Sequence, residues 1–137
     1  MSLTHCGAWW VNGEDWPTPT WPARTDTPTE HASSVSRGEN WDRARLAAFY
    51  QPWIELAAGG TCVHCGEGGF YNRTPHDVGL RWLRDVLGIL TDAGIGWALW
   101  NLRGPFGVLD SGRQDVDYED FHGHALDRKM LNLLQEF

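Results

Sequence analysis

One glutamate stands among glycines in the segment Gly66-Glu67-Gly68-Gly69. Glycines let a bound molecule approach the backbone closely and permit backbone angles that other residues rarely adopt. A carboxylate presented in this way can act as a nucleophile or as a general base. The segment by itself is more typical of a turn, so its chemistry depends on the elements that position it.

Further carboxylates cluster between residues 110 and 120. One of them could donate a proton beside Glu67 if burial raised its pKa. The alternative is a solvated acidic loop. The candidates are Asp110, Asp115, Asp117, Glu119 and Asp120.

Cysteine and histidine, which are common zinc ligands, also gather near Glu67. Cys62 and Cys65 form a C-x-x-C motif with His64 between them. In an extended strand, side chains alternate between two faces, so Cys62 and His64 share one face and Cys65 lies on the other. The motif therefore cannot chelate zinc as it would in a turn. One face could still bind zinc together with His5 or Cys6, and the alternative is free thiols.

Apolar periodicity predicts helices that alternate with two strands, which is typical of an α/β fold with a parallel sheet. Asn40 is a plausible N-cap of the first helix, and Thr74 with Pro75 marks the start of the second. The strand before Gly96–Asn101 ends at the Glu67 segment, and Gly96–Asn101 itself is apolar on both faces, as in a buried parallel strand. The expected elements are helix Asn40–Ala58, strand Thr61–Cys65, helix Thr74–Gly94, strand Gly96–Asn101, loop Leu102–Gly123 and helix Ala125–Leu134.

The first part of the chain, Thr4–Gly38, reads as a long irregular loop because prolines recur in it. Four tryptophans favour an ordered, ligand-facing loop over a linker. They are Trp9, Trp10, Trp16 and Trp21.

Length and charge bound the class of protein. The 137 residues indicate a single domain, 1–137, which is too short for a complete (β/α)8 barrel of roughly 250 residues. A net charge of −7 argues against nucleic acid and against anionic membranes as partners. There is no visible signal peptide and no run of about 18 apolar residues. The compartment stays unknown, with the cytoplasm as the default, and three cysteines weakly favour a reducing one.

The segment Cys65-Gly66-Glu67-Gly68-Gly69, followed by a helix and then by Gly96-Trp97-Ala98-Leu99-Trp100-Asn101, resembles the seventh and eighth βα units of glycoside hydrolase family five. Thr4-His5-Cys6-Gly7-Ala8-Trp9-Trp10 resembles the segment that follows the sixth strand in some members. The resemblance implies the last two to three βα units of a barrel with parallel strands and flanking helices. It also implies a retaining β-glucosidase or cellulase-like glycosidase.

On this resemblance Glu67 is the nucleophile and Trp100 stacks under the sugar. His5 lies in a segment that lines the cleft in the family. Asn101 and Arg103 lie just past a strand end, where either could contact sugar hydroxyls or hold Glu67 ionised, and the alternative for Arg103 is a salt bridge within the loop. Retaining hydrolysis uses two carboxyl groups and requires no cofactor.

The acid/base glutamate of the family lies on the fourth strand, which has no counterpart here. Activity of the isolated chain is therefore expected to be weak, and best on aryl glucosides whose leaving groups need little protonation. Unpaired strand edges also predict a homo-oligomer, a dimer in the simplest case. The alternative function is a non-catalytic carbohydrate-binding or structural barrel remnant that could bind zinc.

Overall fold

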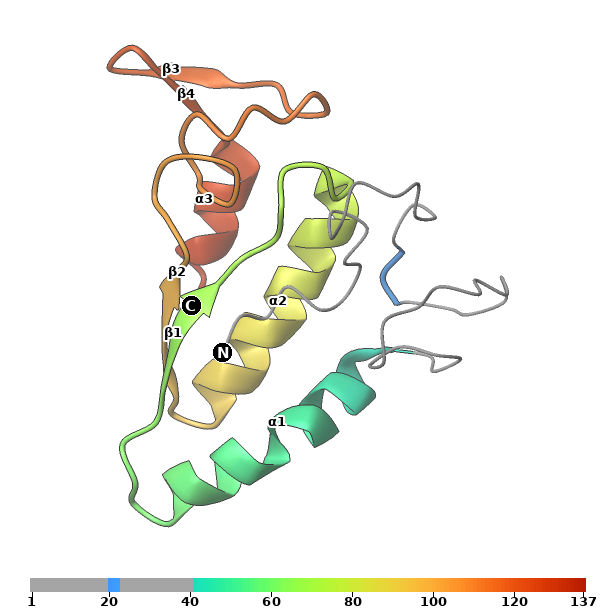
Figure 1. The fold of residues 1–137 in the computed structure, drawn as a ribbon, viewed down its shortest axis with the longest axis vertical. Helices are drawn as coiled ribbons and strands as arrows, with labels where there is room; N and C mark the ends of the chain where they lie inside the picture. Colours follow the sequence, from blue (N-terminus) through green and yellow to red (C-terminus); the bar gives the residue numbers. More distant parts are fainter. Residues whose placement is uncertain (1–19, 23–40) are drawn as a thin grey trace.

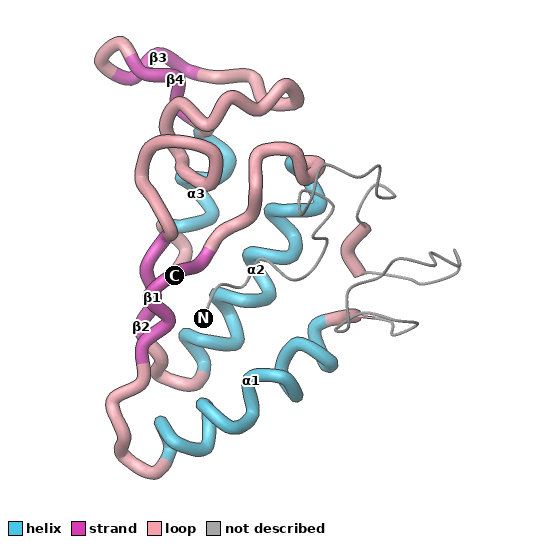
Figure 2. The backbone as a smooth tube through the Cα atoms, in the orientation of Figure 1, coloured by secondary structure: helices cyan, strands magenta, loops and turns pink. Residues whose placement is uncertain are grey.

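The computed structural model describes residues 20–22 and 41–137, and these residues form three helices and two small sheets (Figure 1). Figure 2 shows α2 lying between the strand pair β1–β2 and the outer helix α1. The elements in chain order are α1 Arg43–Ala58, β1 His64–Gly68, α2 His76–Asp92, β2 Gly96–Leu99, β3 Glu119–Phe121, β4 His124–Leu126 and α3 Arg128–Leu134.

Helix α1 begins after Asp42, whose carboxylate accepts a hydrogen bond from the Arg45 N–H at 2.9 Å. The expected N-cap at Asn40 was wrong, because Asp42 satisfies a free N–H of the first turn. Asn40 itself lies outside the described residues. The helix ends at Gly59-Gly60 as expected, and Gly60 adopts φ +86°, which glycine tolerates without strain.

Helix α2 is capped from a distant loop. The residue before it is Pro75, and no side chain of the adjoining segment caps the helix. Instead, the His76 N–H donates to Asp115 Oδ2 at 2.7 Å. The expected cap at Thr74 was therefore wrong, since a carboxylate 39 residues away takes that place. The cap thereby ties the start of α2 to the loop that follows β2.

Strands β1 and β2 pair in parallel, as the alternation of elements predicted. Their bounds differ from the prediction. β1 runs His64–Gly68 and not Thr61–Cys65, because the Thr61 N–H still bonds back to Leu56 O at 3.0 Å in the turn after α1. Glu67 consequently lies inside the strand. β2 ends at Leu99, and its residues are exposed or half-buried, because within the described residues no third strand joins this sheet.

The segment expected to be one loop contains part of a β-hairpin. β3 and β4 pair antiparallel across His122-Gly123, where both residues have positive φ (53° and 84°). Two positive φ values form the type I′ turn that matches the twist of paired strands. The last helix therefore starts at Arg128 and not at Ala125, and Asp127 caps it by accepting from the Met130 N–H.

The core gathers around α2, whose apolar side packs against residues of α1, α3 and the strands. Trp21 is also buried in this core, with its indole N–H donating to Asp85 Oδ2 at 2.8 Å. This corrects the expectation of a ligand-facing Trp21; the tryptophans at 9, 10 and 16 lie outside the described residues. The buried apolar residues of α2 are Trp82, Leu83, Val86, Leu87, Ile89 and Leu90.

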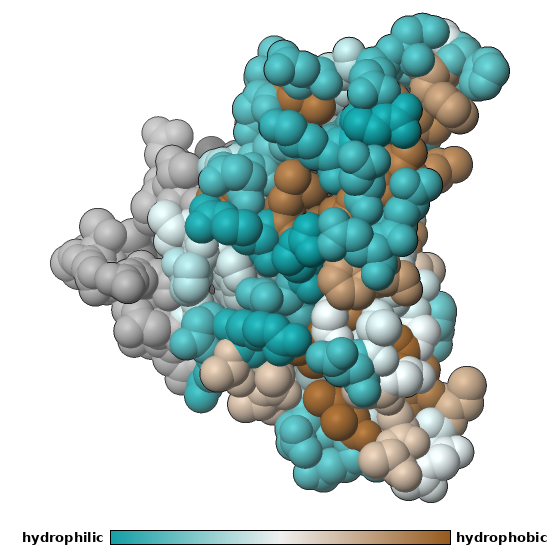
Figure 3. Space-filling model, turned by 180° about the vertical axis from the view of Figure 1, so that it is seen from behind, coloured by the Kyte–Doolittle hydropathy of each residue, from teal (hydrophilic) through white to brown (hydrophobic). Residues whose placement is uncertain are grey.

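No helix in the described part of the chain has the length and apolarity to span a membrane. Seen from behind, pale and apolar residues appear along the side that carries the strand pair, whereas polar residues dominate the upper half (Figure 3). Five large apolar side chains are exposed in the described residues: Leu56, Trp100, Leu102, Phe121 and Phe137.

Two glycines of α2 should respond in opposite ways to alanine. A Cβ at Gly79 would meet the Phe70 ring at 2.1 Å, whereas one at Gly88 would meet the flexible end of Arg43 at 3.4 Å and the Phe137 ring at an ordinary 3.7 Å. We expect Gly79→Ala to lower the free energy of unfolding by about 1–3 kcal/mol through overpacking. Gly88→Ala should raise it by about 0.5–1 kcal/mol through helix propensity. Urea unfolding measures both, and equal effects would refute the Phe70–Gly79 packing.

Candidate functional site

The pairing of β1 with β2 contains one irregularity, and it falls at Glu67. Cys65 pairs with Trp97 and Gly68 pairs with Leu99, so Gly66 and Glu67 together oppose the single residue Ala98. An extra residue of this kind is a β-bulge. Bulges bend a strand and change the face on which later side chains emerge, and they are common beside active sites.

The bulge determines which face of the sheet carries Glu67. Cys65, Trp97 and Leu99 pack against the helical core. Because Gly68 pairs with Leu99, the residue before it falls on the opposite face, together with Ala98. In a strand without the bulge, Glu67 would share the face of Cys65 and point toward the helices. The register thus places half-buried Glu67 on the face that no helix covers within the described residues.

Trp100 follows Leu99, the last residue of β2, and alternation continued by one residue assigns it to the same open face. Its backbone N–H donates to Gly68 O at 2.8 Å, which continues the pairing beyond β2. The Trp100 side chain is 51% exposed, so its ring is available to a ligand. Glu67 and Trp100 therefore lie on one face, at the carboxyl ends of two neighbouring parallel strands.

Asn101 and Arg103 are placed differently from each other. Asn101 Oδ1 is buried and accepts no hydrogen bond from the described residues. Arg103 Nε donates to Asp110 Oδ2 at 2.5 Å, so the alternative expected for Arg103, a salt bridge within the loop, is formed. Arg103 remains well exposed at the same edge as Asn101. His5 lies outside the described residues.

Most of the acidic loop serves the structure of the loop itself. Asp110 accepts hydrogen bonds from Arg103, from the Ala125 N–H at 2.8 Å and from His124 Nδ1 at 2.8 Å. These interactions, the Ala125 N–H first, hold the pKa of Asp110 below its usual value. Asp115 caps α2 and Glu119 pairs with Arg128.

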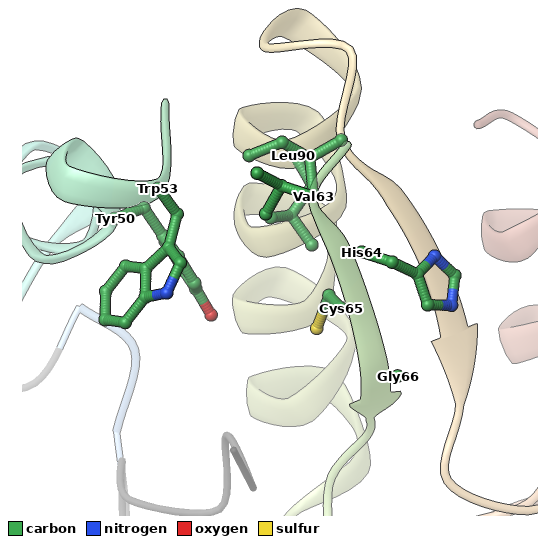
Figure 4. A pocket seen from close by; sticks show the side chains of 8 residues that line it. Tyr50, Trp53, Val63, His64, Cys65, Gly66 and Leu90 are labelled. Carbon is green, nitrogen blue, oxygen red and sulfur yellow. The ribbon is translucent and has the colours of Figure 1, made fainter. Parts of the chain in front are cut away.

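The C-x-x-C motif alternates as the sequence predicted. Cys62 is exposed, whereas half-buried Cys65 packs toward the helices. In Figure 4 the Cys65 sulfur points into a pocket between β1 and Trp53 of α1, and His64 points to the other side of the strand. No group of three possible metal ligands occurs within residues 20–22 and 41–137. His5 and Cys6, the other two candidate zinc ligands, lie outside these ranges, so zinc binding stays an untested expectation.

Arg113 is a site residue that the sequence did not reveal. It is 3% exposed, and its guanidinium group donates to the carbonyl oxygens of Phe70 and Thr74 at 2.9 Å and of Tyr71 at 3.2 Å. These carbonyls belong to the loop that follows Glu67. Its sequence neighbours, Gly112 and Gln114, give no indication that the side chain is buried.

The structure is similar to a solved structure described as the crystal structure of a glycoside hydrolase. The two share 34% sequence identity at a TM-score of 0.77, over 96% of this chain and 37% of the other. Comparison with protein-family models gave no match, and comparison with curated proteins gave none. The chain thus has the fold of part of a glycoside hydrolase and spans little more than a third of that protein's length. Family five and a (β/α)8 barrel remain predictions.

The reactivity of the two described thiols tests whether Cys65 packs toward the helices while Cys62 stays exposed. Burial raises the pKa of Cys65, and a protonated thiol reacts slowly. We expect iodoacetamide at pH 8 to alkylate Cys62 at least about tenfold faster than Cys65. Peptide mapping by mass spectrometry on a Cys6→Ser background measures both rates, and faster alkylation of Cys65 would contradict its packing against the helices.

Proposed function

We propose that this chain carries the nucleophile and a sugar-binding surface of a retaining glycosidase that acts on β-glucosidic bonds. The observation that supports it best is the common face of Glu67 and Trp100 at the carboxyl ends of β1 and β2. The likeness to a glycoside hydrolase supports the same class of chemistry.

In the proposed reaction, a Glu67 carboxylate oxygen attacks the anomeric carbon of a β-glucoside. The new bond from oxygen to carbon forms as the bond to the leaving group breaks, and water later hydrolyses the glycosyl-enzyme ester. Trp100 packs against the apolar face of the sugar ring. Asn101 and Arg103 lie at the same edge as candidates for contact with sugar hydroxyls, and Arg103 is exposed although it pairs with Asp110.

The partner acid is proposed to come from outside the described residues. A retaining mechanism needs a second carboxyl group about 5 Å from the nucleophile. Asp110, Asp115 and Glu119 already have structural partners. A second copy of the chain that covers the unpaired strand edges is the proposed source. Sedimentation at micromolar concentration should then show a dimer, and a well-folded monomer would contradict this part of the proposal.

A second candidate function is carbohydrate binding without turnover. The structural hydrogen bonds of Asp110, Asp115 and Glu119 favour it, because they leave these carboxylates unavailable as proton donors. In that case oligosaccharides would bind on the exposed Trp100 ring, Trp100→Ala would abolish binding, and Glu67→Gln would leave it unchanged. Titration calorimetry with cello-oligosaccharides, together with metal analysis of the purified chain, separates this function from catalysis.

A fluorosugar tests the nucleophile without requiring the missing acid. 2-Deoxy-2-fluoro-β-glucosyl fluoride loses fluoride as a carboxylate oxygen bonds to its anomeric carbon, and the ester accumulates. We expect mass spectrometry to find the adduct on Glu67, and Glu67→Gln to hydrolyse an aryl glucoside at least about a hundredfold more slowly than the parent. Glu55→Gln, which changes an exposed carboxylate of α1, is the matched control. Equal rates for Glu67→Gln and the parent would refute the assignment.

A further inference from the structure

Two loops border the face that carries Glu67 and Trp100. One comprises residues 69–75, between β1 and α2, and the other comprises residues 100–118, between β2 and β3. We infer that Arg113 is a positioning residue that holds these two loops together and thereby keeps Glu67 in register with Trp100. Its catalytic consequence rests on the proposed function, but its structural consequence does not.

Arg113 contacts the first loop at four places. Besides its three carbonyl hydrogen bonds to Phe70, Tyr71 and Thr74, its guanidinium carbon lies 4.2 Å from the centre of the Phe70 ring. Phe70 is 5% exposed and sits directly on Gly79 of α2. The Arg113 side chain therefore fixes a segment that begins two residues after Gly68, the residue that pairs with Leu99 of β2.

The Arg113 backbone is fixed in the second loop. Its N–H donates to the Tyr118 hydroxyl oxygen at 2.7 Å, and the same oxygen lies 2.8 Å from Ser111 Oγ. Ser111 in turn accepts a hydrogen bond through its backbone oxygen from Asn72 Nδ2 at 2.7 Å. Tyr71 and Phe106 add a ring contact between the loops at 5.4 Å. Arg113 is thus rigidly held at both ends of its side chain.

Charge supports a geometric role for this residue. Burial lowers the pKa of Arg113, while the charges of Asp115 and Asp127 oppose that shift. Its acceptors are neutral carbonyls, so among the described residues the buried cation has no direct ion pair that would offset its desolvation. The planar fork of donors reaches three carbonyls at once, which a lysine ammonium on a flexible stem cannot reproduce.

The bulge explains why such a residue is needed. Strand pairing is interrupted at Gly66 and Glu67, and it resumes only at Gly68 with Leu99 and with the Trp100 N–H. A short pairing beyond a bulge gives few hydrogen bonds to hold the register. The contacts of Arg113 between the two loops lie just beyond this pairing, and they restrict the movement of β1 relative to β2.

Hydrogen exchange at the Trp100 amide tests the inference without any substrate. In Arg113→Met and Arg113→Lys we expect this amide to exchange at least about tenfold faster than in the parent, while amides in the centre of α2 such as Val86 change little. Arg81→Met, which removes an exposed arginine of α2, is the control and should leave both unchanged. If the Arg113 variants fail to fold, Tyr118→Phe replaces them, because it removes the hydroxyl that accepts from the Arg113 N–H. It should also accelerate exchange of the Trp100 amide. An unchanged Trp100 rate, or equal acceleration throughout α2, overturns the inference.

Labelling by the fluorosugar then tests whether Arg113 affects the reactivity of Glu67. In variants whose circular dichroism shows intact helices, adduct formation on Glu67 should be at least about tenfold slower than in the parent. Labelling at the parent rate would show that Arg113 does not position the nucleophile. A parent chain that is never labelled refutes the proposed function, and the exchange rates still decide the structural part of the inference.

Discussion

The parallel pairing of β1 with β2 is the interaction on which the site depends. Parallel strands bring their carboxyl ends to the same edge of a sheet, so residues far apart in the chain meet there. Glu67 and Trp100 are separated by all of α2, yet they lie near the hydrogen bond from the Trp100 N–H to Gly68 O. A two-stranded sheet is at best marginally stable in water, and the apolar side of α2 supplies the stabilisation that the pair lacks.

The molecule divides its core into an apolar end and a polar end. Near the turn from α2 into β2 the core is formed by aliphatic residues such as Leu90 and Ile95. At the other end, His76, Arg113 and Asp127 are buried. Burial alone would raise the pKa of Asp127, but hydrogen bonds from His76 and the Met130 N–H outweigh it and lower the pKa. An unsatisfied buried group costs about 1–3 kcal/mol, so this network requires nearly all of its members.

The sequence predicted the helices and the parallel strands because apolar periodicity is a local property. It failed where distant groups decide the outcome. Asp115 caps α2 from another loop, and the ends of β1 depend on the turn after α1. The bulge at Gly66 and Glu67 could not be read from the sequence either, because it exists only relative to the partner strand. Arg113 escaped notice for the same reason, since its acceptors are backbone carbonyls more than 35 residues away.

The electrostatics of the acidic loop bear on where a proton donor can come from. A general acid at neutral pH needs a raised pKa, which burial without donors provides. Asp110 has the opposite environment, because the Ala125 N–H, His124 and Arg103 all stabilise its ionised form. Protonating it would break the contacts that join the loop to β4. Asp110 is therefore held in its ionised form, and the proton donor of the proposed reaction would be a carboxyl group in a drier setting on the open side of the sheet. Within the described residues no helix covers this face, so the cover has to come from residues outside the described ranges or from a second copy of the chain.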